Sequence, residues 1–179
     1  MKFGTALFTL IVVLSLLFLA SGCTQTSTGN ATATPAITAA AEPVATPALT
    51  TNETMVAFVR EAVAYARSHG KEAALAEFSN KNGSFFRGEL YIYAYDFNGT
   101  TIAHPVNPEK IGVNRLNETD ARGNYFIREL RDTAVNGSGF VGYYYINPVH
   151  NNTVEKKLGY VEKAGDDWFL GSGIYEGPA

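Results

Sequence analysis

The stretch LYIYAYDFNGTTIAHP, which runs from Leu90 to Pro105, decides the fold. Read with a period of two, it places Tyr91, Tyr93 and Tyr95 on one face of a strand and three aliphatic residues on the other. The aliphatic face suits a hydrophobic core. The tyrosine face is also apolar, but it carries hydroxyl groups that can donate or accept hydrogen bonds. We therefore expect a strand over residues 90–96 whose two faces meet different surroundings.

A turn follows this strand and reverses the chain. Asn98 and Gly99 tolerate the positive φ of tight turns, so residues 97–100 predict a turn and residues 101–104 the second strand of a hairpin. In such a hairpin, His104 lies near the strand that carries the tyrosines. Pro105 favours an extended conformation at His104, because the proline ring disfavours helical geometry in the residue before it.

The rest of the domain predicts helices before strands. Asn52 or Thr54 is expected to cap the first helix, and Gly70 to end it. The expected helices cover 54–68, 71–78 and a segment from about residue 124; the expected further strands cover 140–145, 157–162 and 168–175. Helices followed by strands in hairpin order indicate an α+β fold, with a five-stranded antiparallel sheet and helices packed on one face.

The N-terminus, MKFGTALFTLIVVLSLLFLASGC, is typical of a secretory signal. Small residues precede Cys23, and this spacing resembles the lipobox of lipoproteins, which implies a signal peptide over 1–22 and a lipidated Cys23. Two alternatives stay open. The apolar run could remain as a membrane anchor, since about 20 residues span a bilayer, or the chain could be secreted free. The preferred reading places the protein on the cell membrane, lipid-anchored and facing outside the cytoplasm.

A flexible stalk and a single domain follow. Residues 24–52 are rich in Thr, Ala and Pro and hold too little apolar surface to fold, so we expect the stalk to end there and one domain to occupy 53–179. Cys23 is the only cysteine, which excludes an intrachain disulfide and a cysteine metal site. No metal or cofactor motif is present. Cleavage of the signal peptide would remove Lys2 and leave 13 basic and 17 acidic residues. This acidic balance argues against binding to nucleic acid.

An ordered set of residues resembles a known family, the single Cache domain. This is the PAS-like extracytoplasmic sensor module of bacterial and archaeal chemoreceptors and sensor kinases. The residues that carry the resemblance are Tyr93, Asp96, Gly99, His104-Pro105, Gly112, Asp120, Gly123, Gly139-Phe140-Val141, Tyr143, Pro148, Lys157, Tyr160, Trp168 and Gly171 to Tyr175. The resemblance implies a five-stranded antiparallel sheet, a long N-terminal helix and a small-ligand pocket between the sheet and its covering loops.

The resemblance also implies a class of ligand and a mode of output. Typical ligands of the family are small organic acids and similar metabolites. Family members usually continue through a membrane helix into a cytoplasmic module, whereas this sequence stops at Ala179. We therefore expect the output to lie elsewhere: in a co-receptor, in a transporter, or in simple scavenging of the ligand. Tyr145 stands where related sequences often carry Trp.

The candidate binding residues are aromatic or basic. A small-ligand pocket needs mostly apolar walls with a few convergent polar groups. The candidates are Tyr91, Tyr93, His104, Tyr143, Tyr145 and Lys157. Lys157 would supply a point charge for a carboxylate, and His104 a ring N–H. The alternative is that these residues only pack the sheet.

Three further readings remain open at this stage. Asp120 could accept a ligand amine or cap the following turn. The protein could be a cell-surface interaction module with a vestigial pocket, which a pocket filled by side chains would favour. It could also be an enzyme, for instance a hydrolase that uses His104 with Asp120, but the sequence offers neither a positioned nucleophile nor a metal site. We therefore expect a binding protein and not an enzyme.

Overall fold

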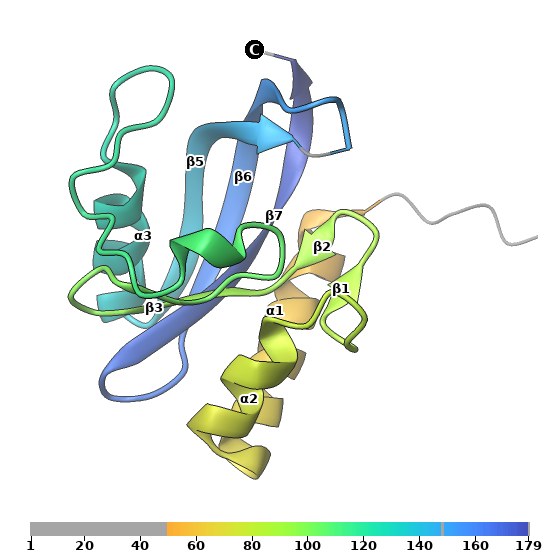
Figure 1. Ribbon diagram of the computed structural model, residues 1–179, viewed down its shortest axis with the longest axis vertical. Coiled ribbons are helices and arrows are strands. Elements are labelled where there is room, and N and C mark those ends of the chain that lie inside the picture. Colours follow the sequence, from red (N-terminus) through yellow and green to blue (C-terminus); the bar gives the residue numbers. More distant parts are fainter. Residues whose placement is uncertain (1–49, 148, 179) are drawn as a thin grey trace, which may run out of the picture. The chain divides into compact units, whose positions relative to one another are not determined.

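The computed structural model describes residues 50–147 and 149–178 (Figure 1). The predicted signal peptide, Cys23 and most of the predicted stalk lie outside the described residues. The helices are α1 (Asn52–His69), α2 (Lys71–Phe78), the 3-10 turn η1 (Pro108–Lys110) and α3 (Phe126–Val135). The strands are β1 (Phe86–Arg87), β2 (Leu90–Tyr91), β3 (Tyr93–Asp96), β4 (Thr101–Ala103), β5 (Ser138–Asn147), β6 (Thr153–Lys163) and β7 (Trp168–Pro178).

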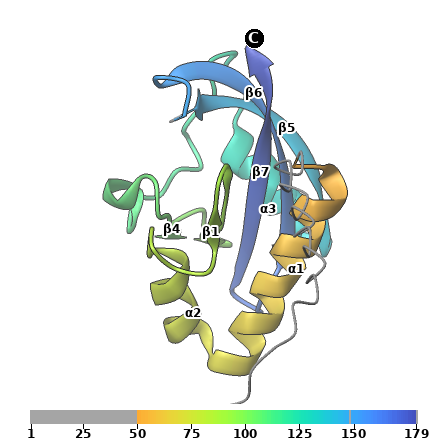
Figure 2. The same cartoon turned by 90° about the vertical axis from the view of Figure 1, so that its right-hand side faces the viewer.

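The main sheet has five strands in the order β4-β3-β7-β6-β5, and all neighbouring pairs are antiparallel. This confirms the predicted α+β class and the five-stranded sheet. The two long hairpins of β5, β6 and β7 form the larger part of the sheet, and β3 with β4 extends it past β7 (Figure 1). Figure 2 shows α1 lying along the long strands.

The tyrosine-bearing strand is interrupted at Ile92. Tyr91 belongs to β2 and pairs with Phe86 of β1, whereas Tyr93 belongs to β3 and pairs with Gly171 of β7. The single strand predicted over 90–96 is therefore wrong at this residue. The alternation itself persists, since side-chain direction follows the extended backbone even where the pairing partner changes. Gly171 allows the close approach of β3, because a Cβ there would lie 2.9 Å from the Tyr93 ring.

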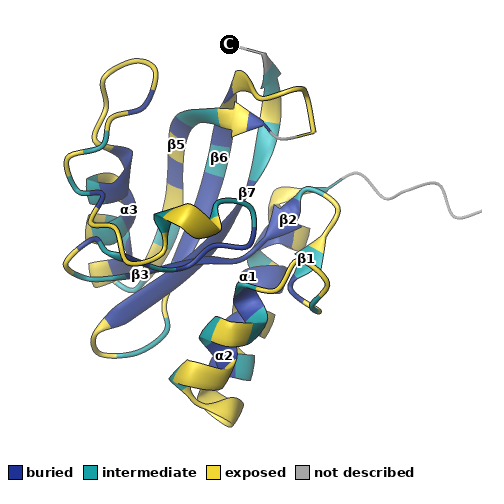
Figure 3. Ribbon diagram, viewed as in Figure 1, coloured by how far each residue is buried: buried dark blue, intermediate teal, exposed yellow. Residues whose placement is uncertain are grey.

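The face of the sheet under α1 and α2 is an apolar core. Met55, Phe58 and Val59 of α1 and Phe78 of α2 are almost fully buried against it. The aliphatic residues of the tyrosine strand face this core, as predicted. Thr51 caps α1 through a reciprocal capping box, so the predicted cap at Asn52 or Thr54 is wrong by one residue or more. Figure 3 shows that β3 and much of β7, in the middle of the sheet, are buried.

The opposite face is covered by α3 and by the loop between β4 and α3. Phe126, Ile127 and Leu130 of α3 pack against Tyr93 and Tyr143 in a second buried cluster. The predicted arrangement, with helices on one face, holds for α1 and α2 but not for α3. The reason is that α3 carries its own apolar stripe, which is buried only by covering the tyrosine face.

The loop between β4 and α3 is fastened to the hairpin along part of its length. The Thr101 N–H donates to the Val113 carbonyl at 3.0 Å, and the Gly112 N–H donates back to Thr101 at 2.8 Å. The Arg115 N–H donates to the Gly99 carbonyl at 2.9 Å. A side chain at Gly99 would collide with Leu116, and its φ of 83° also favours glycine. The hairpin therefore holds residues 112–116 against the sheet.

Candidate functional site

A small cavity lies at the centre of the tyrosine face. Its walls come from β2, β3, β5, α3 and the residue after β4, and its volume is about 10 Å3, which is room for one water molecule. The lining residues are Tyr91, Tyr93, Tyr95, His104, Phe126, Leu130, Tyr143 and Tyr145. The structure thus brings together five of the six predicted binding residues. The cavity is nearly filled by their rings.

Lys157, the sixth predicted residue, lies behind a wall of this cavity. Its Nζ donates to the Tyr91 hydroxyl at 2.9 Å and to the Tyr175 hydroxyl at 3.3 Å. It also lies 4.4 Å from the ring centroids of both tyrosines. Tyr91 accepts this lysine N–H and itself lines the cavity, whereas Lys157 does not. Lys157 therefore acts on the cavity through Tyr91.

The charge of Lys157 is buried without a counter-ion. The residue is 1% exposed, and among residues 50–147 and 149–178 no carboxylate forms an ion pair with it. Burial lowers the pKa of Lys157 to about 7, which the more distant charge of Glu89 only partly opposes. Its neighbour Lys156 is exposed and pairs with Glu176.

His104 is held neutral beside the tyrosines. It is 2% exposed, and its ring centroid lies 5.4 Å from that of Tyr91. The Asn107 N–H donates to its Nδ1 at 3.0 Å. Burial, together with the positive charges of Lys157 and Arg115, lowers the pKa of His104 to about 3. A neutral ring whose Nδ1 accepts a hydrogen bond can present an N–H only at Nε2.

Arg115 is a site residue that no sequence pattern singled out. Its Nη1 donates to the Tyr95 hydroxyl at 2.6 Å, and its Nε and Nη2 donate to the Glu118 carboxylate, each at 2.7 Å. Burial alone would lower its pKa, but the bonds to Glu118 keep the pKa of Arg115 above its usual value. The loop around it has no periodicity. Its only signal was that Arg115 is one of two basic residues, with Lys110, between Pro105 and Asp120.

Tyr145 separates the cavity from the surface. It is half-buried, and its hydroxyl accepts from the Asn107 Nδ2 at 2.8 Å and from the Arg115 Nη2 at 3.4 Å. On its outer side lies a groove of about 240 Å3, lined among others by Asn107, Lys110 and Glu118. Tyr145 and Phe126 line both the groove and the cavity.

Asp120 is a cap for the loop before α3. Its carboxylate accepts from the backbone N–H groups of Arg122, Asn124 and Tyr144 at 2.8, 2.9 and 3.2 Å. Burial would raise its pKa, but these bonds lower the pKa of Asp120 below its usual value. Asp120 lines the outer groove and not the cavity that contains His104. This favours the capping role over a ligand amine or a catalytic pair with His104.

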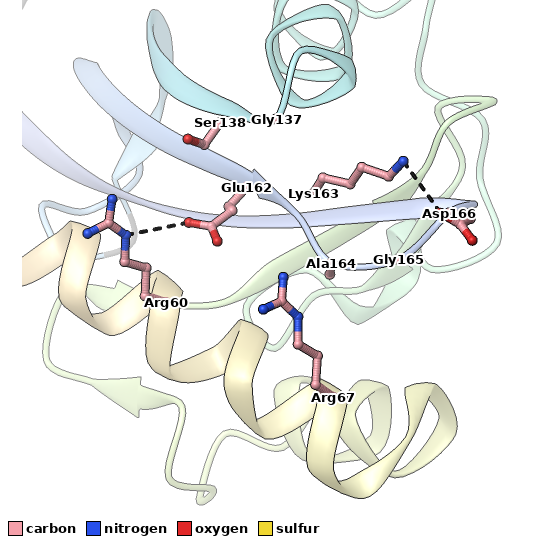
Figure 4. A pocket seen from close by; sticks show the side chains of 9 residues that line it. All are labelled: Arg60, Arg67, Gly137, Ser138, Glu162, Lys163, Ala164, Gly165 and Asp166. Atoms are coloured by element: carbon pink, nitrogen blue, oxygen red, sulfur yellow. Dashed lines mark ion pairs between the residues drawn. The ribbon is translucent and has the colours of Figure 1, made fainter.

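A larger groove, of about 500 Å3, lies between α1 and the turn from β6 to β7 (Figure 4). Arg60 pairs with Glu162 and Lys163 with Asp166, so two of its basic side chains face acidic neighbours. Most of these side chains are well exposed, and exposed pairs interact weakly. The groove is open and lacks the enclosed apolar walls of a small-ligand site.

Two other features are absent from the described residues. These residues contain no cluster of three or more His, Cys, Asp or Glu side chains that could hold a metal ion. None of their helices combines the length and the apolar character needed to cross a bilayer.

The match to a protein family decides the identification. The family described as single Cache domain 2 matches residues 48–177. The chain belongs to this family. It is a Cache-type sensor domain, and Cache domains are ligand-binding signalling modules of membrane receptors.

Relatives of the Cache domain include chemoreceptors and a kinase. The sensor histidine kinase MctS of Rhizobium johnstonii is 33% identical over 85 residues, which are 48% of this chain and 18% of the kinase. The match therefore spans less than a fifth of that relative. A methyl-accepting chemotaxis protein of Vibrio parahaemolyticus has a TM-score of 0.60 and 26% identity, with 69% of this chain and 86% of that chain covered.

A second solved structure concerns recognition by a Cache domain. It is a Cache chemosensory domain solved to show the structural basis of carboxylic acid recognition. It has a TM-score of 0.59 and 26% identity, with 70% of this chain and 92% of that chain covered. Similarity at this level agrees with the Cache fold described above.

Proposed function

We propose that this Cache domain binds a short organic acid in the tyrosine-lined cavity and passes the signal to a partner protein. In this proposal the domain is not an enzyme. It acts outside the cytoplasm, tethered through a lipidated Cys23 or through an N-terminal membrane anchor. The partner is a co-receptor or a signalling protein.

One observation carries the proposal: the buried, unpaired Lys157. An isolated buried charge is costly, and a protein keeps it neutral or supplies a counter-charge. Arg115 already has Glu118 as its partner, and His104 is neutral. Lys157 is therefore the cationic group at this site that lacks an ion pair within the described residues. An acid with one carboxylate would balance it.

The hydroxyl groups around the cavity support the same class of ligand. Tyr91, Tyr93 and Tyr143 surround the cavity with rings and hydroxyls, an arrangement that holds a small carboxylate by hydrogen bonds and its carbon chain by apolar contact. A hydrogen bond to a charged group contributes about 1.5 to 3 kcal/mol. Likeness to the Cache domain solved for carboxylic acid recognition agrees with this class.

A second candidate function has its own observation. The cavity of about 10 Å3 is almost filled by side chains, as expected of an interaction module whose pocket is vestigial. We favour ligand binding because a vestigial pocket leaves the buried Lys157 without a counter-charge, whereas a bound carboxylate supplies one.

The experiment is thermal unfolding of a soluble form of residues 49–179, screened against short carboxylates, amino acids and amines. A ligand present at 100 times its dissociation constant stabilises the folded state by about 2.7 kcal/mol, which raises the midpoint by several degrees in a domain of this size. Carboxylates should raise the midpoint. Lys157→Ala should abolish the increase, whereas Lys156→Ala, the exposed neighbour, should retain it.

The outcomes separate the two candidates. A carboxylate shift that depends on Lys157 supports the sensor-type pocket. A shift only with amines or amino acids would replace the proposed ligand class. No shift with any compound would favour the interaction module.

A further inference from the structure

The buried cavity and the outer groove share two wall residues. The buried cavity holds about 10 Å3 and the outer groove about 240 Å3, and Phe126 and Tyr145 line both. The cavity as it stands is too small for an acid of even two carbons, since it has room for one water. A ligand can bind there only if part of the wall moves.

Of the two shared residues, Phe126 is the fixed one. It is 2% exposed and stacks on Tyr143, with ring centroids 5.0 Å apart and an interplanar angle of 18°. It also belongs to α3, whose apolar stripe is buried against the sheet. Tyr145 is half-buried, and the empty groove lies on its outer side. Its ring is therefore less enclosed than that of Phe126 and can turn into the groove.

The hydroxyl of Tyr145 is held by two donors of the covering loop. Asn107 donates to it from Nδ2 at 2.8 Å, and Arg115 from Nη2 at 3.4 Å. The Asn107 backbone N–H also donates to the His104 Nδ1 at 3.0 Å, which ties the same residue to a wall of the cavity. A carboxylate is a stronger acceptor than a phenol hydroxyl, because charge-assisted hydrogen bonds are roughly twice as strong as neutral ones.

We propose that Tyr145 is a gate between groove and cavity, and that it is the residue that limits the length of the acid that binds. This inference rests on the proposed binding of an organic acid. An acid that enters from the groove competes for the amide of Asn107 and releases the tyrosine hydroxyl. The ring turns into the groove, and the acid takes the space that the ring leaves. The ligand shifts this equilibrium because it binds the open state more tightly than the closed one.

The gate gives two separable predictions. Removal of the ring also frees the part of the groove that the turned ring occupies in the wild type, so Tyr145→Ala should bind longer acids than the wild type does. Removal of the hydroxyl alone abolishes the hydrogen bond from Asn107 but keeps the ring. Tyr145→Phe should therefore bind the same acids with faster association. Asn107→Ala should act like Tyr145→Phe. Tyr144→Ala is the matched control, since Tyr144 lines the groove but not the cavity.

The experiment uses the full chain in detergent and the unbranched acids from acetate to hexanoate. Affinities are measured by calorimetry, and rates by NMR line shapes of the acid's methyl signals. We expect the wild type to bind the shortest acids and to lose affinity steeply with each added carbon. In Tyr145→Ala, hexanoate should gain at least about tenfold relative to acetate, a change of about 1.4 kcal/mol. Tyr144→Ala should keep the wild-type profile.

The results that overturn the gate differ from those that overturn acid binding. If the wild type and Tyr145→Ala bind acids with the same dependence on length, the gate is wrong and acid binding stands. If Tyr145→Phe and Asn107→Ala associate at the wild-type rate, the hydrogen bond between Asn107 and the Tyr145 hydroxyl does not hold the gate closed. This test remains available if Tyr145→Ala fails to fold. If no acid binds to the wild type or to any variant, the proposed function is wrong and the gate falls with it.

Discussion

The two faces of the sheet differ in what they bury. Under α1 and α2 the sheet packs against hydrophobic side chains such as Met55 and Phe78. Under α3 and its loop it buries tyrosines together with His104, Lys157 and Arg115. The first kind of burial stabilises the fold through the hydrophobic effect. The second requires polar groups to leave water, which is unfavourable unless they find partners. Both faces bury apolar side chains, since Phe126, Ile127 and Phe169 belong to the second cluster, but the candidate binding chemistry lies on the tyrosine face.

The largest effect is expected from the apolar face. Phe78 is fully buried, and its ring packs edge-on against that of Phe85, with centroids 4.9 Å apart. Phe78→Ala should lower the free energy of unfolding by about 3 to 5 kcal/mol, because it removes a buried ring and leaves a cavity. Urea unfolding measures this change. Phe140→Ala is the control, since Phe140 is 49% exposed and should cost far less. An equal loss in both variants would contradict this account of the face.

A pH-dependent effect should come from the tyrosine face. The pKa of Lys157 is about 7 in the folded state, and the usual value of a lysine is 10.5. Between these values the unfolded chain binds more protons, so the free energy of unfolding should rise with pH, by up to about 1.4 kcal/mol per unit. The rise should be clear between pH 7 and 9. Lys157→Met should remove it and should be more stable than the wild type below pH 7.

The control for this titration is Lys156→Met, which removes an exposed lysine. It should leave the slope of stability against pH unchanged. A slope that persists in Lys157→Met would show that another group is responsible, and the contrast between the faces would then lose its electrostatic basis.

A smaller effect is expected where the tyrosine face meets its loop. Asp120→Ala removes the acceptor of three backbone N–H groups, one of them on β5. The loss should be about 1 to 3 kcal/mol, because Asp120 is buried and its removal leaves N–H donors without their acceptor. Thermal unfolding measures it, with Asp132→Ala on the exposed side of α3 as the control. A loss no larger than that of the control would refute the capping role.

The smallest effect is expected from an ion pair beside the apolar face. Glu61 accepts two hydrogen bonds from Arg87, at 2.7 and 2.9 Å, and both side chains are about half exposed. The Arg87 hydrogen bonds lower the pKa of Glu61. Glu61→Gln should cost only about 0.2 to 1 kcal/mol, and 1 M salt should weaken the pair in the wild type. A cost comparable to that of Phe78→Ala would mean that polar contacts also govern this face.

The sequence predicted much of this contrast because side chains alternate along a strand. The alternation of Tyr91, Tyr93 and Tyr95 with aliphatic residues assigned each side chain to its face correctly. It did not reveal the break at Ile92, since a period of two reports direction and not hydrogen-bond partners. The side of the sheet covered by α3 was likewise undetermined, because an apolar stripe shows that a helix is buried but not against which face.

The candidate site was predictable only where it is built from regular elements. Tyr143 and Tyr145 on β5 and Lys157 on β6 occupy strand positions that a pattern can locate. Arg115 and Asn107 lie in an irregular loop, where proximity to the cavity depends on the path of the chain. The position of Lys157 behind Tyr91 depends on cross-strand packing, which periodicity does not encode.

The attachment of the loop to the hairpin turn has a consequence for the kinetics of exchange. Residues 112–115 are bonded to the backbone of residues 99–101, whereas residues 107–110 reach the sheet mainly through Asn107. Release of Asn107 would thus be a local opening that leaves the rest of the domain folded. Amide protons of the first segment would exchange with solvent only slowly, and those of the second quickly. A domain built in this way can replace one ligand by another many times within the lifetime of a single folded molecule.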